Sequence, residues 1–252
     1  MARQVSPALV LGASSFAAIL VAWEGVVRVG LANPFFISQP TAIATALADQ
    51  ARSGDLARNL GVSLAEFAAG YVAAAVVGIA LGLLAGRLRT FEYILEPFLW
   101  LLYSAPLVAL FPLFVLWFGL GSGTVIAITF LLAVTPITAN TLSGIKEVNP
   151  NLIHAARSFG ANEGDLLRKV ILPASLPLLV AGLRLGVGRA LTGVVVAELF
   201  GATAGLGYSI AYYGGLLKTT EMLASLMVVV ALGVVSTQTL SALEARFDSW
   251  RN

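Results

Sequence analysis

Six long apolar segments constrain this chain more than any other feature of its sequence. An α-helix needs about 20 apolar residues to cross the hydrocarbon core of a bilayer. The six segments have about that length, and they lie at about 8–29, 67–86, 98–118, 123–143, 174–200 and 222–243. The sequence therefore predicts an all-α membrane protein with six transmembrane helices, forming a single domain over residues 1–252.

The composition excludes several classes of protein. Charged residues make up only 11% of the 252 residues, and hydrophobic residues make up 58%. Soluble domains carry about 25% charged residues, so a cytosolic enzyme and a nucleic-acid-binding protein are both excluded. The chain has no cysteine, which removes thiol catalysis and thiolate metal ligands. The sequence predicts neither a catalytic residue nor a metal site.

The basic residues predict how the chain is oriented in the membrane. If the N-terminus is cytoplasmic, nine basic residues fall in cytoplasmic segments, four in external segments and two inside the fifth span. The nine are Arg3, Arg87, Arg89, Lys146, Arg157, Arg168, Lys169, Arg246 and Arg251. Because Lys and Arg are enriched in cytoplasmic loops, we expect both termini of this multi-pass protein to be cytoplasmic.

The connection between the fourth and fifth spans, residues 144–173, is the most polar part of the chain. Asn149 followed by Pro150 is typical of a helix N-cap and first turn, and Gly160 is typical of a helix end. The apolar residues of this short helix recur at helical intervals, at Leu152, Ala156 and Phe159. The pattern predicts a short amphipathic helix outside the bilayer.

A second short helix is expected directly after the first. Asn162, with Asp165 three residues later, is typical of a helix start, and we expect Pro173 to end this helix. Two helices of this length are not stable alone in water. The hairpin must therefore pack against the ends of its own spans or against another protein.

The hairpin also carries a spacing of small residues and proline that is known from one family. Five positions are concerned: Ala155, Ala156, Gly160, Leu172 and Pro173. They resemble the signature E-A-A-x3-G-x9-I-x-L-P, the EAA motif of the membrane subunits of ATP-binding-cassette (ABC) importers. His154 stands where the motif has glutamate, and Val170 stands where it has isoleucine.

Further segments extend the resemblance over about residues 33–247. They are Ser38 to Thr41, Pro106 to Leu113, Leu116 to Gly119, Ala156 to Gly160 and Val196 to Glu198. They are similar to segments of permeases that import sulfonates, taurine, nitrate and related small molecules. The resemblance implies a permease subunit that forms a substrate pathway by alternating access in the cytoplasmic (inner) membrane of a bacterium.

The resemblance also implies a set of partners. A second permease subunit, identical or different, would complete the pathway within the membrane lipid. Two ATPase subunits would bind ATP and Mg in the cytoplasm, and a periplasmic or lipid-anchored binding protein would deliver the substrate. This chain itself would bind no cofactor and no nucleic acid. The sequence agrees, because it contains no phosphate-binding loop of the form G-x4-G-K-[ST].

The same resemblance assigns ATPase coupling to one set of residues in the hairpin. They are His154, Ala155, Ala156, Arg157, Ser158, Phe159, Gly160, Asn162 and Asp165. The small residues among them would let the hairpin dock closely on an ATPase and move with it as a lever. We interpret His154 as a polar residue of the docking surface rather than as a pH sensor.

Candidates for the substrate pathway lie in the third and fifth spans. They are Pro106, Phe111, Pro112, Arg184, Arg189 and Glu198. A charged side chain at bilayer depth is costly and marks a functional position or a partner. Arg189 stands where the permeases that the chain resembles more often have an apolar residue, and a buried cation there would favour an anionic substrate. The alternative is a structural ion pair between Arg189 and Glu198 of a partner chain.

Two further questions stay open at the level of sequence. A self-sufficient secondary transporter or channel could use Arg184, Arg189 and Glu198 as an ion relay, without any docking hairpin. Glycines also recur at intervals of four in the second and fifth spans, at Gly78, Gly82, Gly86, Gly182 and Gly186. Such glycines permit close helix crossings, either within one subunit or between subunits.

Overall fold

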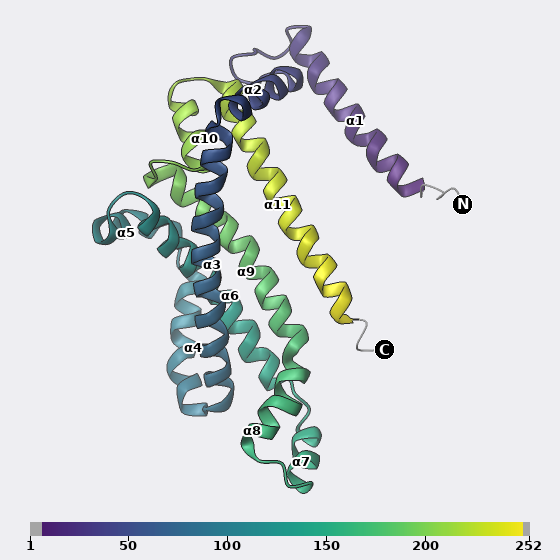
Figure 1. The fold of residues 1–252 in the computed structure, drawn as a ribbon, viewed down its shortest axis with the longest axis vertical. Coiled ribbons are helices and arrows are strands. Elements are labelled where there is room, and N and C mark those ends of the chain that lie inside the picture. The colour runs from purple at the N-terminus through teal and green to yellow at the C-terminus, as the bar shows by residue number, and fades with distance from the viewer. Residues whose placement is uncertain (1–6, 249–252) are drawn as a thin grey trace.

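The computed structural model describes residues 7–248, and the side chains from 11 to 239 except Ala13. Figure 1 shows that this part of the chain is built from helices. They are α1 (Pro7–Arg28), α2 (Pro40–Ser53), α3 (Asp55–Arg87), α4 (Arg89–Ser104), the 3-10 helix η1 (Leu107–Leu110), α5 (Phe111–Phe118), α6 (Ser122–Lys146), α7 (Pro150–Ser158), α8 (Glu163–Asp165), the π-helix η2 (Leu166–Ile171), α9 (Leu172–Gly201), α10 (Leu206–Gly215) and α11 (Thr219–Asp248). The all-helical prediction is confirmed for these residues.

Four continuous helical segments are long and apolar enough to cross a membrane. They are α3, α6, the segment Glu163–Gly201, and the first part of α11 at Thr219–Thr239. A fifth candidate consists of α4 together with η1 and α5, two pieces bent by 90°. The first predicted segment, 8–29, coincides with α1, and its crossing of the membrane stays a prediction. The termini at 1–6 and 249–252, including Arg3 and Arg251, lie outside the described residues.

The third predicted span was wrong as a single helix over 98–118. The structure has α4 ending at Ser104, a bend, and a separate short helix α5 beginning at Phe111. The bend lies at Pro106, whose ring fixes φ and removes a backbone donor. Pro106 has φ −72° and ψ 76°, outside the helical region. An apolar run cannot reveal such a break from its length alone.

The core of the molecule is formed where α3 and α9 pack against α6. Glycines bring the backbones together on both sides of α6. A Cβ placed on Gly78 would lie 2.9 Å from Ile137, and one placed on Gly186 would lie 2.7 Å from the same side chain. The other glycines that meet α6 in this way are Gly70, Gly82, Gly86, Gly182 and Gly193. The glycine spacing seen in the sequence therefore serves packing within one chain.

Buried threonines make α6 the central helix. Thr129, Thr138 and Thr141 are buried, and each hydroxyl donates to the carbonyl oxygen four residues earlier at 2.7–2.8 Å. Each hydroxyl is therefore satisfied inside its own helix, and the remaining methyl group packs against the neighbouring backbone. In this way α6 presents a small, apolar surface to α3 and α9.

The fifth span is longer than the sequence indicated, because Pro173 does not end the preceding helix. The helical segment runs without interruption over 39 residues, from Glu163 to Gly201. Pro173 lies in the first turn of α9, directly after the π-helical turn η2. At this point the hydrogen-bond register changes from i+5 to i+4, and we attribute the tolerance of a proline without N–H to this change. The second arm of the hairpin and the span therefore form one continuous helical segment.

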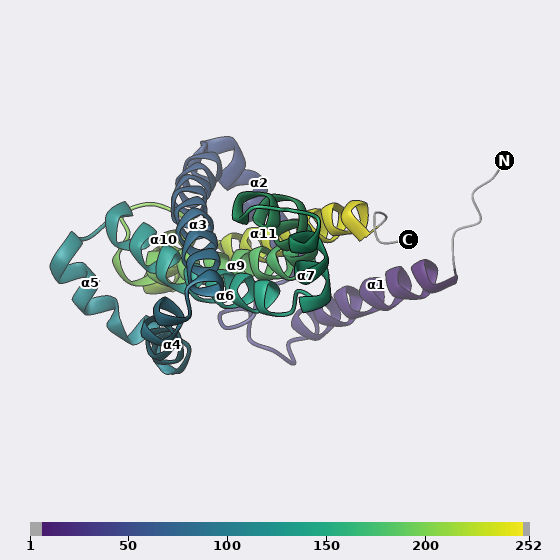
Figure 2. The same ribbon diagram turned by 90° about the horizontal axis from the view of Figure 1, so that it is seen from below.

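The two ends of the molecule along its long axis, seen in Figure 1, are named here by the helices they contain. The α7 end contains α7 and α8, and the α2 end contains α2, α10 and the start of α11. At the α2 end, the Gln50 side chain donates to the Glu221 carbonyl oxygen at 3.1 Å and ties α2 to α11. Helix α1 stands apart from the packed core in Figures 1 and 2. Helix α10 had no counterpart among the predicted elements.

Substitution of Gly82 by alanine tests the close packing of α3 on α6. The added methyl group would lie 2.9 Å from the Thr138 carbonyl oxygen, and we expect overpacking to lower the free energy of unfolding by about 1–3 kcal/mol. The matched control is Gly61→Ala on the same helix, where no atom lies within 4 Å of the added carbon. That change should leave stability equal or raise it by up to about 1 kcal/mol. Unfolding of both variants in detergent micelles measures the difference, and equal stabilities would contradict the packing.

Candidate coupling hairpin and substrate cavity

The hairpin is built by the capping residues that the sequence indicated. The Asn149 side chain accepts a hydrogen bond from the Asn151 N–H at 2.9 Å, and Pro150 occupies the first turn of α7. Gly160 follows α7 with φ +84°, a conformation that favours glycine. The Asn162 side chain accepts from the Asp165 N–H at 2.9 Å and begins α8. The predicted caps are confirmed.

The first helix of the hairpin exposes apolar side chains. Phe159 is 92% exposed and Leu152 is 52% exposed. Ala155 and His154 are exposed beside them, and Ala156 is half-buried. Exposed aromatic and aliphatic groups next to small residues are typical of a surface that a partner covers. Ser158 contributes no such surface, because its hydroxyl donates to the His154 carbonyl oxygen within α7.

One ion pair joins the arms of the hairpin, and two contacts fix the hairpin to the spans. The Arg157 guanidinium pairs with the Glu163 carboxylate at 2.9 Å and joins the two arms. The Arg87 side chain, at the end of α3, donates to the Glu163 carbonyl oxygen at 3.0 Å. Leu166 is only 1% exposed and anchors η2 in the core. The hairpin is therefore held to the core at its inner side and uncovered at its outer side.

Ion pairs surround this anchor. Lys146, the last residue of α6, pairs with Glu92 of α4. Lys169 pairs with Asp165 one turn earlier on the same rod, at 2.6 Å. Both lysine side chains are more than half exposed, so these pairs are weak as stabilising contacts. They mark the α7 end as the polar end of the long helices.

Arg189, an exposed residue of α9, lines a partly open cavity. The cavity has a volume of about 240 Å³ and lies between the α4–η1 bend, α6 and α9. Its lining includes Pro106 at the bend and Pro136 inside α6. The Tyr103 side chain also lines it, close enough to Arg189 to feel the charge of the guanidinium. The structure therefore brings two predicted pathway residues, Pro106 and Arg189, to one cavity.

A backbone carbonyl group without its helical hydrogen bond belongs to the residues that line this cavity. Pro136 lacks an N–H, so the Leu132 carbonyl oxygen has no helical donor at that position. Both Leu132 and Pro136 line the cavity. A cationic guanidinium, a phenol and a carbonyl oxygen without its helical partner are groups that orient a small polar solute.

The other pathway candidates lie elsewhere. Phe111 packs its ring beside Gly201 and lies 5.8 Å from the Phe200 ring, centroid to centroid. Pro112 is in the first turn of α5. Arg184 is exposed on α9, more than one turn from Arg189 and outside the lining of the cavity. These residues therefore do not form one site with Arg189 in the single chain.

Glu198 is buried at the α2 end and takes part in a different cluster. One carboxylate oxygen accepts from the Ser63 hydroxyl at 2.6 Å, and the other accepts from the Gly207 N–H at 2.6 Å. Glu198 is 1% exposed. Sequence reasoning missed Ser63 and its role, because this serine is 135 residues away along the chain and belongs to no recognised motif.

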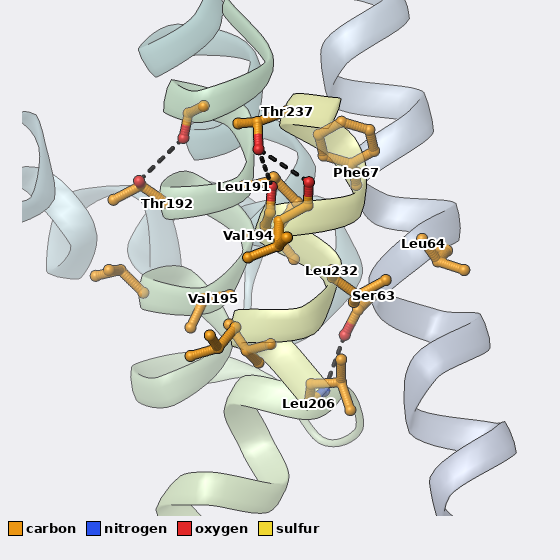
Figure 3. Close-up of a pocket in the computed structure, with 16 residues that line it drawn as sticks. Ser63, Leu64, Phe67, Leu191, Thr192, Val194, Val195, Leu206, Leu232 and Thr237 are labelled. Atoms are coloured by element: carbon orange, nitrogen blue, oxygen red, sulfur yellow. Dashed lines mark hydrogen bonds between the residues drawn. The ribbon is translucent and has the colours of Figure 1, made fainter. Parts of the chain in front are cut away.

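A second, larger cavity is apolar. It has a volume of about 580 Å³ and lies between α3, α9 and α11, as Figure 3 shows. Among its lining residues no side chain is charged, and the hydroxyls of Thr192 and Thr237 donate to carbonyl oxygens of their own helices. Such a lining suits lipid or apolar side chains and gives no means to select a polar solute. Among the described residues there is also no cluster of three metal-ligating side chains.

Comparison with known proteins assigns the fold and the family. Residues 78–249 match the family described as "Binding-protein-dependent transport system inner membrane component". The chain is 32% identical to the taurine transport system permease protein TauC of Escherichia coli strain K12, over 99% of this chain and 91% of that protein. It is 30% identical to the formylaminopyrimidine transport permease protein ThiX of Halalkalibacterium halodurans, over 94% of each.

Solved structures agree with this assignment at the level of fold. An inward-facing form of the MetNI methionine ABC transporter superposes with a TM-score of 0.70 at 21% identity, covering 77% of this chain and 96% of that one. Permeases of this kind are not catalytic, because partner ATPase subunits hydrolyse ATP. A self-sufficient transporter is therefore not needed to explain the charged residues of α9. The chain belongs to the family of binding-protein-dependent transport system inner membrane components, and it is an inner-membrane permease subunit of an ABC importer.

Proposed function

We propose that the hairpin formed by α7 and α8 docks on an ATPase subunit and drives alternating access to the Arg189 cavity. The observation that carries this proposal is the exposure of Phe159 and Leu152 on a hairpin that is continuous with α9. An exposed phenylalanine in a polar segment is costly in water unless a partner covers it. A groove on the ATPase subunit would bury this surface. The ATPase subunit, and not this chain, would bind ATP and Mg.

The continuous rod explains how docking would reach the cavity. Glu163 and Arg189 lie on the same helical segment, 26 residues apart, which is about 40 Å at 1.5 Å per residue. The glycine contacts with α6 hold that segment against the core. A displacement of the hairpin therefore moves α9 and its cavity-lining residues together, as a rigid body.

The orientation follows from the same assignment. If the hairpin meets an ATPase, the α7 end is cytoplasmic, together with Arg87, Lys146 and Lys169. The positive-inside distribution supports this orientation. The α2 end then faces the periplasm, where a binding protein would deliver the substrate. Both chain termini would be cytoplasmic.

A second copy of this chain would complete the pathway. The side of α1 that the structure describes is strongly apolar and exposed, with Phe16 and Ile19 each 64% exposed. Arg184 and Arg189, on different sides of α9, are both exposed in the single chain. The apolar surface of α1 can be covered by lipid, but the charged residues of α9 need neighbouring protein. In a symmetric homodimer, the second copy would supply neighbouring protein at both α1 and α9.

We propose a small organic anion, such as a sulfonate, as the substrate. The support is the Arg189 guanidinium in the central cavity, because a cation in a site of low polarity favours an anionic group. The relative TauC transports taurine according to its name, and taurine carries a sulfonate. The relative ThiX is named for formylaminopyrimidine, so selection by charge needs a direct test.

Replacement of Phe159 by alanine tests the docking surface. Because Phe159 is 92% exposed, the chain should fold as before, and the loss should appear only in the complex. We expect binding of the ATPase subunit, measured on the permease in lipid nanodiscs, to weaken by about tenfold or more, as for aromatic hot spots. Uptake driven by ATP should fall with it.

Phe36→Ala is the matched control. Phe36 is also exposed, at 72%, but it belongs to the connection between α1 and α2, and α2 lies at the end of the molecule opposite α7 (Figure 1). Its loss should leave ATPase binding unchanged. Equal binding of the Phe159 and Phe36 variants would remove the hairpin from the docking surface.

Replacement of Arg189 by alanine tests selection by charge. In the complete importer reconstituted with its binding protein, we expect uptake of taurine and other sulfonates to fall at least about tenfold, a loss of one charge-assisted contact. Basal ATP hydrolysis should persist, because the hairpin is unchanged. Arg189→Lys should retain part of the uptake.

The matched control for charge is Arg52→Ala, on the surface of α2, where the side chain is 80% exposed. It should transport as the unmodified protein does. If Arg189→Ala carries every sulfonate at the normal rate, the cavity does not select anions, and neutral cargo becomes the better assignment.

A further inference from the structure

Two buried carboxyl groups meet at the α2 end of the core. Glu66 on α3 is 3% exposed and Glu198 on α9 is 1% exposed. Glu66 lies one helical turn after Ser63 on α3, and the Ser63 hydroxyl donates to the Glu198 carboxylate at 2.6 Å. No base or cation is among the groups that act on Glu198. Two ionised carboxylates cannot share such a site, because their repulsion and their loss of hydration both oppose it.

Two hydrogen-bond donors face the Glu198 carboxyl group. Its two carboxylate oxygens accept from the Ser63 hydroxyl and from the Gly207 N–H, each at 2.6 Å. The Gly207 N–H belongs to the first turn of α10, a ten-residue helix. A negative charge is stabilised at that position by the helix dipole. Glu198 therefore has the surroundings of a carboxylate.

Glu66 has the opposite surroundings. Its Oε2 atom is buried and has no hydrogen-bond partner among the described residues. An ionised carboxylate with an unpartnered buried oxygen is far less stable than a neutral carboxylic acid in the same place. A proton on Glu66 also converts the contact with Glu198 from a repulsion into a hydrogen bond, with Glu66 as the donor.

We propose that Glu66 and Glu198 bind one proton between them, and that this proton joins α3 to α9 and α10. The site extends through Ser63, whose hydroxyl accepts from the Leu206 N–H at 2.8 Å while it donates to Glu198. Figure 3 shows the Ser63 side chain directed at the Leu206 nitrogen. Gly205, with φ +116°, leaves the space that the Glu198 carboxylate occupies.

The elements packed around the pair bring no charge that could replace the proton. Helix α10 contains no Asp, Glu, Lys or Arg, and its tyrosines are its titratable groups. The charged residue of α6 is Lys146, at the far end of that helix. On α3 the nearest charge is Arg58, two turns from Glu66, and on α9 it is Arg189, nine residues from Glu198. The stretch of α11 that lines the neighbouring cavity, 229–237, is uncharged.

The hydrogen bond between Glu66 and Glu198 exists only while the proton is bound, so it is lost when the proton leaves. Because the site holds the first turn of α10, the loss should loosen α10 against α3.

Infrared spectroscopy of the full chain in lipid nanodiscs tests the proposal. At neutral pH the protein should show the carbonyl stretch of a protonated carboxylic acid, and Glu66→Gln should abolish the part due to this pair. Glu96→Gln, at an exposed position of α4, is the matched control and should leave the band unchanged. A spectrum of Glu66→Gln with the same acid band as the unmodified protein would overturn the proposal.

Melting of the same samples gives an independent readout that needs no variant. The unmodified chain should melt at a lower temperature as the pH is raised above neutral, and Glu66→Gln, whose amide donates permanently, should lose that dependence. Melting should also be indifferent to exchange of sodium for a large organic cation. If sodium raises the melting temperature and Glu66→Gln removes this effect, the site binds a metal cation, and the proposal of a shared proton is wrong.

Discussion

The close approach of α3 and α9 to α6 is the contact on which the rest of the structure depends. In a bilayer, helices gain little from leaving lipid for one another, and van der Waals packing has to hold them. Glycines remove the side chains that would separate the backbones, and a Cβ at Gly70 or Gly182 would lie only 2.7 Å from α6. The three helices consequently behave as one body, to which the bent α4–α5 segment and α10 are attached.

The continuous segment from Glu163 to Gly201 links the parts of that body to which we assign a function. At one end it carries the exposed hairpin, in its middle it carries Arg189, and near its other end it carries Glu198. The hairpin, the proposed substrate cavity and the loop before α10 therefore all adjoin the same helical segment. At the α2 end the segment is joined to α3 by the hydrogen bond from Ser63 to Glu198, and the proposed proton between Glu66 and Glu198 would strengthen this connection.

Local features could be predicted from the sequence, and contacts between distant residues could not. Asn149, Gly160 and Asn162 act within a few residues of themselves, so their caps were readable. Pro173 was misread because the preceding π-helical turn, which accommodates the proline, has no sequence signal. Helix α10 was missed because it is held by Ser63 and Glu198, two side chains that reach it only in the folded chain. The docking and pathway roles came from family resemblance and stay predictions.

If the hairpin and α9 move as one rod, the distance between a site in the hairpin and a site in α9 stays constant during the transport cycle. The chain has no native cysteine, so spin labels can be placed at Lys169→Cys and Leu185→Cys, both exposed positions, in the assembled importer. With labelled chain diluted in unlabelled chain, the distance between the two labels should be the same without nucleotide and with ATP bound. The distance between labels on Leu185→Cys of two subunits should change. A change in the first distance with no change in the second would place a hinge in the rod and contradict the account.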